Sequence, residues 1–406
     1  MKIVFIQPKT IFGNTWEALN IGYMSAYLKS KSYPDIGFFS GFFDSDEEII
    51  KGCQDADIIG FSCTSPQMKH GIELAKKIKN KKNWIVFGGV HPSVLPEDVI
   101  ETFPVDAVVV GEGEDAMLKI AQGNRRKILK MPYIQNLDSL PFPNRVVIKQ
   151  ERNIAQAFKD NGIRIASIFS SRGCPFQCAF CASHCVWTRY TRFRSVENVL
   201  DEVEQIVNDL KIDFVKFSDD TFGVRKDWMM QFCKDKILRG IDTPFGCNIR
   251  VNTVDEETLE WMKKAGCKEV WVGVESGSPK ILKDMKKGIT VDKVRWAFDA
   301  TKKIGLFRRA YVLLGMPNES MEDIKMTESL IDEIQPDMVG FTILAPYPGT
   351  EFYNPAIHKN VDWSLVDEYG NGLIRTKYLT NDELKTEQIR LVEKYRNIIT
   401  YRQSKK

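Results

Sequence analysis

The sequence lacks long hydrophobic runs, a marked excess of charge of either sign and a recognisable export signal. Its apolar runs are only a few residues long, well short of the roughly 20 that a membrane-spanning helix requires. The 57 basic and 54 acidic residues leave a net charge of +3, which gives no electrostatic indication of nucleic acid as a partner. The N-terminal residues Met1 to Pro8 resemble a first β-strand and not a signal peptide. We therefore expect a cytoplasmic protein with no membrane attachment and no nucleic-acid partner.

Cysteine is present in a number that does not suit a disulfide framework. Nine cysteines in 406 residues is an odd number, so reduced thiols that bind metal or fill the core are the better interpretation. Apolar residues make up 43% and charged residues 27% of the chain, which is typical of globular proteins. The length suggests two or three domains.

The first third of the chain alternates short apolar runs with amphipathic stretches. Uniformly apolar strands are covered on both faces, and the helices between them supply that cover. We therefore predict an N-terminal doubly wound, Rossmann-like α/β domain over residues 1–135, with its ligand site at the carboxyl ends of the strands. The strands are expected at 2–6, 57–62, 84–87 and 107–110, and the helices at 18–29 and 67–79.

A second α/β series follows a proline-rich connection, which we place at residues 136–163. Six β/α units in a row predict a partial (β/α)6 barrel over residues 164–355. Residues 356–406 are expected to form a small mixed element that ends in a helix over 380–401. Strands are predicted at 166–169, 214–217, 244–248, 269–274, 309–314 and 338–344, and helices at 196–210 (capped by Ser195), 227–238, 255–265, 291–304 and 321–334.

Three cysteines lie close together in the loop after the first strand of this second series. Cys174, Cys178 and Cys181 have the tight local spacing with which thiolates hold an iron–sulfur cluster. Three thiolates on a 4Fe–4S cluster leave the fourth iron open to a small molecule. Two alternatives are three buried free cysteines and a zinc site completed by Cys185 or His184.

This loop resembles the radical S-adenosylmethionine (SAM) superfamily, whose pattern is cysteine, three residues, cysteine, an aromatic two places on, then cysteine. Cys174, Cys178, Phe180 and Cys181 match it fully, and the resemblance extends from about residue 164 to 355. It implies that Cys174, Cys178 and Cys181 bind the catalytic cluster, and that SAM on the open iron is cleaved to methionine and a 5′-deoxyadenosyl radical.

The resemblance also implies which residues contact SAM at the ends of the barrel strands. Acidic side chains there accept from the SAM amino group, an arginine pairs with its carboxylate, and a glycine backbone approaches its adenine. The expected contacts are Phe180, Asp219 or Asp220, Arg250, Glu275 and Gly315.

Three glycine- or serine-containing turns in the first domain resemble the cobalamin-binding domain that is fused to many radical SAM enzymes. Glycines let the backbone approach a flat, bulky ligand without Cβ clashes. The alternative is an ordinary doubly wound domain that binds a nucleotide or nothing. The expected cobalamin contacts are Ser62, Thr64, Ser65, Gln67, Gly88, Gly89, His91, Gly111, Glu112 and Gly113.

One stretch departs from the cobalamin domains that ligate cobalt from below through the histidine of Asp-x-His-x-x-Gly. Here the corresponding residues are Gln7 to Gly13, with no histidine. We therefore expect base-off cobalamin without a histidine ligand, its lower face towards the loop at 64–68. His70 is expected on the exposed face of a helix, and His91 near the corrin or its nucleotide tail.

A cobalamin domain followed by a radical SAM barrel resembles the cobalamin-dependent (class B) radical SAM methyltransferases. The resemblance implies methylation of an unactivated sp3 carbon through a 5′-deoxyadenosyl radical and methylcobalamin, with the substrate between the domains. It also implies an electron donor such as ferredoxin or flavodoxin. Domain order and size are further similar to the archaeal enzyme that C-methylates a glutamine of methyl-coenzyme M reductase, so a peptide or protein substrate is expected. Two alternatives are a cobalamin-dependent radical SAM enzyme that forms or rearranges rings without methyl transfer, and a non-catalytic cobalamin or iron–sulfur binding protein.

Overall fold

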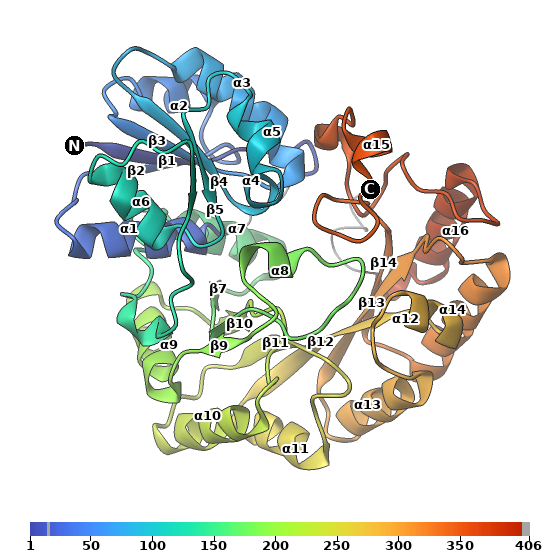
Figure 1. Cartoon of the computed structure of the whole chain (residues 1–406). Helices are drawn as coiled ribbons and strands as arrows, with labels where there is room; N and C mark the ends of the chain where they lie inside the picture. The colour runs from blue at the N-terminus through green and yellow to red at the C-terminus, as the bar shows by residue number, and fades with distance from the viewer. Residues whose placement is uncertain (14–16, 400–406) are drawn as a thin grey trace.

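The computed structural model describes residues 1–13 and 17–399 and contains two six-stranded parallel sheets, one in each of two α/β domains (Figure 1). The first sheet has the strand order β2-β1-β3-β4-β5-β6. Its strands are β1 (Ile3–Gln7), β2 (Ile36–Ser40), β3 (Ile58–Ser62), β4 (Trp84–Gly88), β5 (Ala107–Val110) and β6 (Ile128–Lys130). The helices of this domain are α1 (Leu19–Ser30), α2 (Asp46–Gly52), α3 (Met68–Ile78), α4 (Val90–Val94), α5 (Pro96–Ile100) and α6 (Glu114–Ala121), with a 3-10 turn η1 (Ser65–Gln67).

Helices cover both faces of this first sheet, which confirms the predicted doubly wound domain. Alternate residues of β1 show it: Phe5 packs with Ile120 of α6 on one face, and Val4 packs with Leu74 of α3 on the other. Burial on both faces explains why these strands are uniformly apolar. The edge strands β2 and β6 were not predicted, because neither has a long apolar run.

A helix lies inside the segment predicted as an interdomain connection. That segment contains a 3-10 turn η2 (Leu137–Ser139) and the helix α7 (Glu151–Asn161). Ile154 of α7 is fully buried in the core of the second domain. On its other side, Arg152 pairs with Asp44 of the first domain at 2.5 Å. The helix therefore fastens the two domains together.

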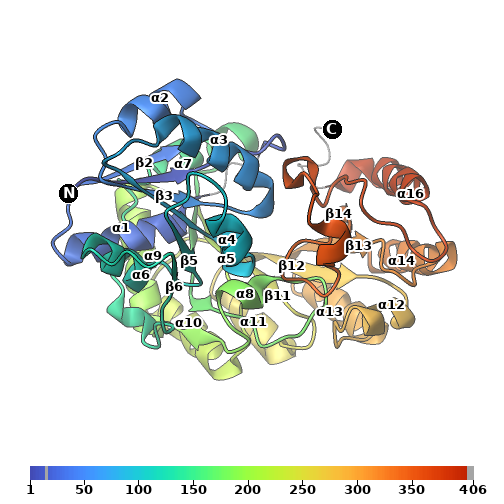
Figure 2. The same cartoon turned by 45° about the horizontal axis from the view of Figure 1, so that its top comes forward.

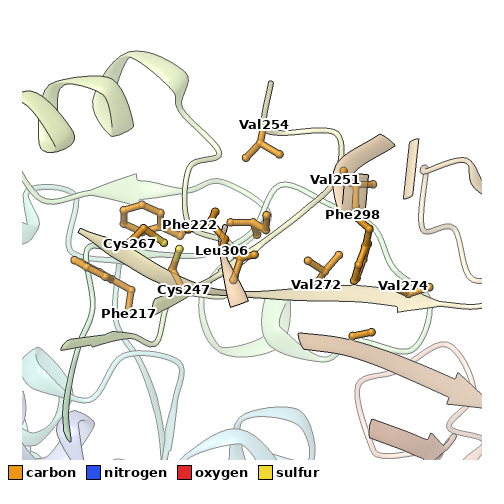
Figure 3. Packing of buried hydrophobic residues seen from close by; sticks show 14 of the residues in the cluster. Phe217, Phe222, Cys247, Val251, Val254, Cys267, Val272, Val274, Phe298 and Leu306 are labelled. Carbon is orange, nitrogen blue, oxygen red and sulfur yellow. The ribbon is translucent and has the colours of Figure 1, made fainter. Parts of the chain in front are cut away.

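The second sheet has the strand order β14-β13-β12-β11-β10-β7 and forms the predicted partial barrel. Figure 1 shows its helices on the outer side, away from the first domain, and Figure 3 shows the apolar side chains that fill the space beneath them, among them Phe217, Cys247 and Val272. The strands are β7 (Ile165–Ile168), β10 (Phe214–Phe217), β11 (Phe245–Ile249), β12 (Cys267–Glu275), β13 (Phe307–Leu314) and β14 (Met338–Ile343). The helices are α9 (Val196–Leu210), α10 (Lys226–Leu238), α11 (Glu256–Lys264), α12 (Pro279–Asp284), α13 (Val291–Lys303) and α14 (Met321–Ile334), and the Ser195 side chain caps α9 as predicted.

The C-terminal segment runs from the barrel back to the first domain. It contains α15 (Pro355–His358), the 3-10 turns η3 (Trp363–Leu365) and η4 (Arg396–Ile398), and α16 (Asn381–Lys394), which lies beside α14 and β14 (Figure 2). The predicted helix over 380–401 ends at Lys394, and Tyr401 lies outside the described residues. Asp362 beside η3 pairs with Lys69 of α3 at 2.7 Å. Across residues 1–13 and 17–399, no helix has the length and apolarity needed to cross a membrane.

Candidate active site between two cofactor-binding domains

The three-cysteine loop is closed at its base by a short hairpin. Strands β8 (Ser171–Arg172) and β9 (Arg192–Phe193) pair antiparallel on either side of it. Gly173 has φ +97°, and a Cβ there would lie 2.4 Å from the carbonyl oxygen of Tyr190. Only glycine fits so tight a closure.

Each cluster cysteine contacts a different polar group, and for Cys174 this is the Thr221 hydroxyl, 3.8 Å from its Sγ. The Arg250 Nη1 donates to Cys178 Sγ at 3.4 Å, and the backbone N–H of Ser183 donates to Cys181 Sγ at 3.5 Å. Desolvation raises the pKa of the Cys174 thiol, and that of Cys181 to about 11. The thiols of Cys174 and Cys181 are therefore protonated at neutral pH unless a bound metal holds them as thiolates.

The zinc alternative finds no support in the structure. Cys185 Sγ donates to the carbonyl oxygen of Gly349 at 3.7 Å and lies 3.6 Å from His184 Nε2. Across the described part of the chain, no three histidine, cysteine or carboxylate side chains converge as ligands of a single metal ion. A cubane cluster does not require such convergence, because each of its thiolates binds a different iron.

Backbone hydrogen bonds hold the loop at the carboxyl ends of the barrel strands. The Ala179 N–H donates to the carbonyl oxygen of Met285 after β12, and the Ala179 carbonyl accepts from Glu351 N after β14, both at 2.9 Å. Phe180 packs beside them against the apolar cluster that includes Leu313 and Met316. The aromatic position of the motif thus fastens the loop to the barrel.

The two adjacent aspartates predicted for SAM lie in different surroundings. Asp219 is fully buried, and its carboxylate accepts from the Ser170 N–H at 3.1 Å and from the Ser170 and Ser171 hydroxyls at 2.7 and 2.5 Å. It therefore holds the strand that leads into the cysteine loop. Asp220 is exposed, and within the described part of the chain its carboxylate accepts only from the Ser183 hydroxyl, at 2.5 Å, while surrounding protein raises its pKa by desolvation. Asp220 is the one of the two with acceptor capacity to spare.

Arg250 has donor capacity that the protein leaves unused. Its guanidinium lies 3.9 Å from the Phe176 ring centroid, and its buried Nε has no hydrogen-bond partner among the described residues. An unpartnered buried donor beside a cluster ligand is the property expected of a group that binds an anion.

Glu275 ends β12 in a strained backbone conformation, with φ +61°. Its carboxylate accepts from Lys287 Nζ at 2.6 Å, and both side chains are almost fully buried. A Cβ at Gly273 would lie 2.4 Å from Glu275 Oε1 and 2.6 Å from Lys287 Nζ, so the glycine makes room for the pair. Sequence reasoning missed Lys287, whose position in a lysine-rich turn resembles an exposed site.

Gly315, predicted near the adenine, is held by a buried carboxylate. Its N–H donates to Glu319 Oε2 at 2.5 Å, and the other oxygen, Oε1, has no partner among the described residues. Burial raises the pKa of Glu319 to about 7. Glu319 was not predicted, because nothing in the sequence marks it apart from a surface glutamate.

In the first domain, the predicted cobalamin residues gather at the carboxyl edge of the sheet. Ser62 ends β3, and its hydroxyl accepts from Asn20 Nδ2 at 2.8 Å. Thr64 caps η1, where Gln67 accepts from the Thr64 N–H at 2.9 Å and donates to the Pro8 carbonyl at 2.6 Å. The loop at 64–68 is therefore fastened to the end of β1.

The two histidines of this edge are both bonded within the protein. His91 is buried beside the Ser65 hydroxyl, 2.9 Å from its Nδ1, and burial lowers the pKa of His91 to about 4. His91 is thus neutral at physiological pH. The expectation of an exposed His70 is wrong: its side chain is only 12% exposed, accepting from the Lys9 N–H at 3.1 Å and lying 3.0 Å from Asp46.

The glycine turns after β4 and β5 lie at the same edge. Gly88 precedes Gly89, which has φ +97° and lies so close to β3 that a Cβ would be 2.7 Å from the Cys63 carbonyl oxygen. Gly111 has φ +81° and faces the second domain, since a Cβ there would lie 3.6 Å from the Val186 carbonyl oxygen. Gly113 begins α6. A Cβ at Gly89, Gly111 or Gly113 would meet neighbouring protein atoms, so glycine at these positions allows the turns to pack closely.

Glu112, predicted as a cobalamin contact, lies in a buried ion-pair network between the domains. It accepts from Arg172 at 2.7 Å and Arg192 at 2.9 Å, both from the hairpin below the cysteine loop. Arg172 also pairs with Glu114 at 2.7 Å and lies between the rings of Tyr23 and Trp187. Glu112 thus positions the cysteine loop relative to the first domain.

The two candidate cofactor sites face one another. Helix α8 (Ser183–Val186), directly after the cysteine loop, contacts α4, directly after the Gly88-Gly89 turn. Gly349 lies at this junction, since a Cβ there would be 2.8 Å from Cys185 Sγ and 3.0 Å from Val94.

The residues present fit the cofactors that the sequence implies. Three thiols beside an arginine with a free donor suit a cluster with SAM on its open iron. The glycine edge of the first domain suits the close approach of a planar macrocycle. Cys174, Cys178 and Cys181 would hold the cluster, and the turns at 62–67, 88–91 and 111–113 would hold cobalamin.

Comparisons with known proteins agree with this geometry. Residues 168–331 match the model of the radical SAM superfamily, and residues 10–121 match that of the B12 binding domain. An uncharacterized methyltransferase of Pyrococcus horikoshii is 31% identical over 394 residues, covering 89% of this chain and 84% of that protein. The anaerobic magnesium-protoporphyrin IX monomethyl ester cyclase of Cereibacter sphaeroides is 26% identical over 424 residues, covering 95% of this chain and 68% of that protein.

A solved structure shares the fold. The radical SAM methyltransferase TsrM of Kitasatospora setae, with cobalamin and a [4Fe-4S] cluster bound, has a TM-score of 0.70 at 15% identity and covers 87% of this chain and 74% of its own. Because the chain matches the models of both the radical SAM and the B12 binding domain, the cofactors are a 4Fe–4S cluster, SAM and cobalamin. The chain belongs to the cobalamin-dependent radical SAM methyltransferases.

Proposed function

We propose that the protein methylates an unactivated sp3 carbon of a substrate that lies between its two domains. The observation that carries the proposal is the junction of α8 and α4, which brings the cysteine loop next to the glycine edge of the first domain. When bound, the cluster with SAM supplies a hydrogen-abstracting 5′-deoxyadenosyl radical, and cobalamin supplies the methyl group. Both must lie within reach of one carbon, which requires a fixed arrangement of the domains.

The protein's own residues have three tasks in this reaction. Arg250 and Asp220 offer a donor and an acceptor beside the cysteines, which suits the carboxylate and amino groups of SAM. Asp219 and Glu319 fix the backbone around that site through hydrogen bonds to Ser170 and Gly315. The buried ion-pair network around Glu112 holds the two domains in a fixed position relative to one another.

The lower face of cobalamin is proposed to have no histidine ligand. His91 is engaged with Ser65, and His70 bonds Lys9 and Asp46. The lower face of cobalamin is instead proposed to lie towards the loop at 64–68. In this loop the Gln67 amide is held in place by hydrogen bonds to Thr64 and Pro8.

For the substrate we propose a peptide or protein. In support of this, the face of the barrel sheet away from its helices carries charged and polar side chains, among them Lys216, Glu269 and Arg309. Such a face suits a polar peptide more than a lipid. A ferredoxin or flavodoxin is proposed as the electron donor in an anoxic cytoplasm, because the exposed Cys181 leaves one side of the loop open to approach.

The test is an anaerobic incubation with cobalamin, SAM, a strong reductant and a peptide panel that includes the glutamine segment of methyl-coenzyme M reductase. We expect a methylated peptide, with S-adenosylhomocysteine and 5′-deoxyadenosine formed in equal amounts. Cys178→Ala should abolish 5′-deoxyadenosine, and the matched variant Cys185→Ala should not. A protein that forms neither SAM product would contradict the proposal.

One relative favours a second candidate, ring formation without methyl transfer. The Cereibacter sphaeroides protein matched over 95% of this chain is named a cyclase. A modified substrate without an added methyl group, formed with 5′-deoxyadenosine but without S-adenosylhomocysteine, would establish this alternative.

A further inference from the structure

One lysine of the barrel sheet stands apart from the helix-packed core. On β10, Val215 and Phe217 are buried under the helices, whereas Lys216 between them points to the opposite, inner face and is exposed. Its neighbours in register on that face are Ser167 of β7 and Gly246 of β11. Charged side chains are uncommon in protein interiors unless they are paired, so a lysine on the inner face of this strand suggests a partner or ligand.

The aromatic rings of Trp271 and Phe214 lie near this lysine. The Lys216 Nζ lies 5.5 Å from the centre of the Trp271 ring. A Cβ at Gly246 would be 3.2 Å from that indole and 2.8 Å from the Phe214 ring, so the glycine allows both rings to approach β11 closely. The result is an ammonium group beside an extended aromatic surface.

The acids near Lys216 are already engaged by other donors. Glu269 accepts at 2.5 Å from both Trp271 Nε1 and Arg309 Nη2. Glu17, from the first domain, accepts from Ser167 N and Oγ at 3.1 and 2.8 Å. Among the described residues, the Lys216 ammonium makes no hydrogen bond or ion pair, and the buried Nε of Arg309 has no partner. Surrounding protein lowers the pKa of Lys216 by desolvation, which the charges of Glu17 and Glu269 oppose and that of Arg309 reinforces.

We propose that Lys216 and Arg309 bind an anionic group of the substrate, a carboxylate or a phosphate, with Trp271 packed against the part of the substrate beside it. The inference rests on the proposed function, because it places this group on the sheet face that leads to the cofactor sites. Trp271 precedes Glu275 by four residues on β12, or about 13 Å along the strand. A substrate anchored here extends its reacting carbon from the inner face to the strand ends.

The chemistry favours an anion over other occupants. A partly desolvated ammonium and an unpaired guanidinium N–H are costly alone, and a carboxylate or phosphate oxygen relieves both. A cation would meet like charge, and a purely apolar ligand would leave both donors unsatisfied.

The test is isothermal titration calorimetry of the cluster- and cobalamin-loaded protein with two probes, 3-phenylpropionate and inorganic phosphate. Binding of the first alone indicates a carboxylate, and binding of the second alone indicates a phosphate. We expect Lys216→Met to weaken binding about tenfold or more, which corresponds to one charge-assisted hydrogen bond, and Lys216→Arg to restore most of it.

Lys234→Met is the matched control. Lys234 also lies over an indole, 5.3 Å from the Trp261 ring centre, but on the outer helices, so this variant should bind like the wild type. The proposal is overturned if neither probe binds the wild type, or if Lys216→Met binds as well as the wild type with an unchanged circular dichroism spectrum. Binding is measured without turnover, so a failure of the anion site and a failure of methyl transfer are separate results.

Discussion

The buried network between the domains allows a quantitative test of how the two halves are held together. Glu112 is 6% exposed and accepts from Arg172 and Arg192 at 2.7 and 2.9 Å, and from the Ile134 N–H at 2.8 Å. Glu112→Gln keeps the shape but leaves a buried guanidinium without its counter-charge. Removing one partner of a buried ion pair costs about 3–5 kcal/mol. Since the glutamine oxygen still accepts one hydrogen bond, we expect a loss of about 3 kcal/mol in the free energy of unfolding.

The pH dependence gives a second measure of the same interaction. Burial opposes ionisation of Glu112, but the hydrogen bonds and charges of Arg192 and Arg172 outweigh it, so its pKa lies below the ordinary 4.5. A carboxyl with a lowered pKa stabilises the fold above its unfolded pKa, and this stabilisation is lost as the pH falls through its folded pKa. Glu112→Gln should therefore lose less stability than the wild type on acidification below pH 4.5.

Urea unfolding, followed by tryptophan fluorescence and far-ultraviolet circular dichroism, measures both effects. The control is Glu393→Gln, because Glu393 and its partner Arg396 are each 70% exposed, and we expect no measurable change there. If Glu112→Gln unfolds within 1 kcal/mol of the wild type, the network does not hold the domains together, and the account of the interface fails.

Three further predictions concern the cofactor sites. Arg250→Met should make the cluster's reduction potential more negative in an EPR-monitored titration, because it removes a donor to the Cys178 sulfur; an unchanged potential would refute this role. Cys181→Ala should lose most of the bound iron and sulfide, whereas Cys185→Ala should keep them, and equal losses would show that Cys185 is a ligand. Glu319 has a pKa of about 7, so SAM affinity by equilibrium dialysis should fall as the pH drops through 7, when the carboxylate that holds the Gly315 loop is protonated. Glu319→Gln should remove that pH dependence, and a variant that keeps it would assign it to another group.

The local pattern was enough to predict most of the elements that carry the site. Apolar runs marked the central strands of both sheets, and the periodic stretches between them became helices near their expected bounds, as for α9 with its Ser195 cap. The cluster site was likewise predictable from the spacing of the three cysteines, because its ligands are close together in the chain.

What sequence could not show depends on contacts between distant residues. Glu112 was predicted as a cobalamin contact from its place in a glycine turn, yet it pairs with arginines 60 and 80 residues away. Nothing in the sequence singles out Lys216 within its predicted strand, because Trp271, the ring beside it, comes from a different strand. Helix α7 was not predicted, because only one of its residues, Ile154, is fully buried, and this residue packs against a domain that follows it in the chain.

We propose that both SAM-dependent steps of methyl transfer occur in this protein. The most direct measurement is an anaerobic incubation of the loaded protein with reductant and SAM bearing a deuterated methyl group, analysed by liquid chromatography and mass spectrometry. We predict deuterium-labelled methylcobalamin together with S-adenosylhomocysteine, and 5′-deoxyadenosine that disappears in Cys178→Ala. Retained cobalamin and abundant 5′-deoxyadenosine with no labelled methylcobalamin would contradict methyl transfer.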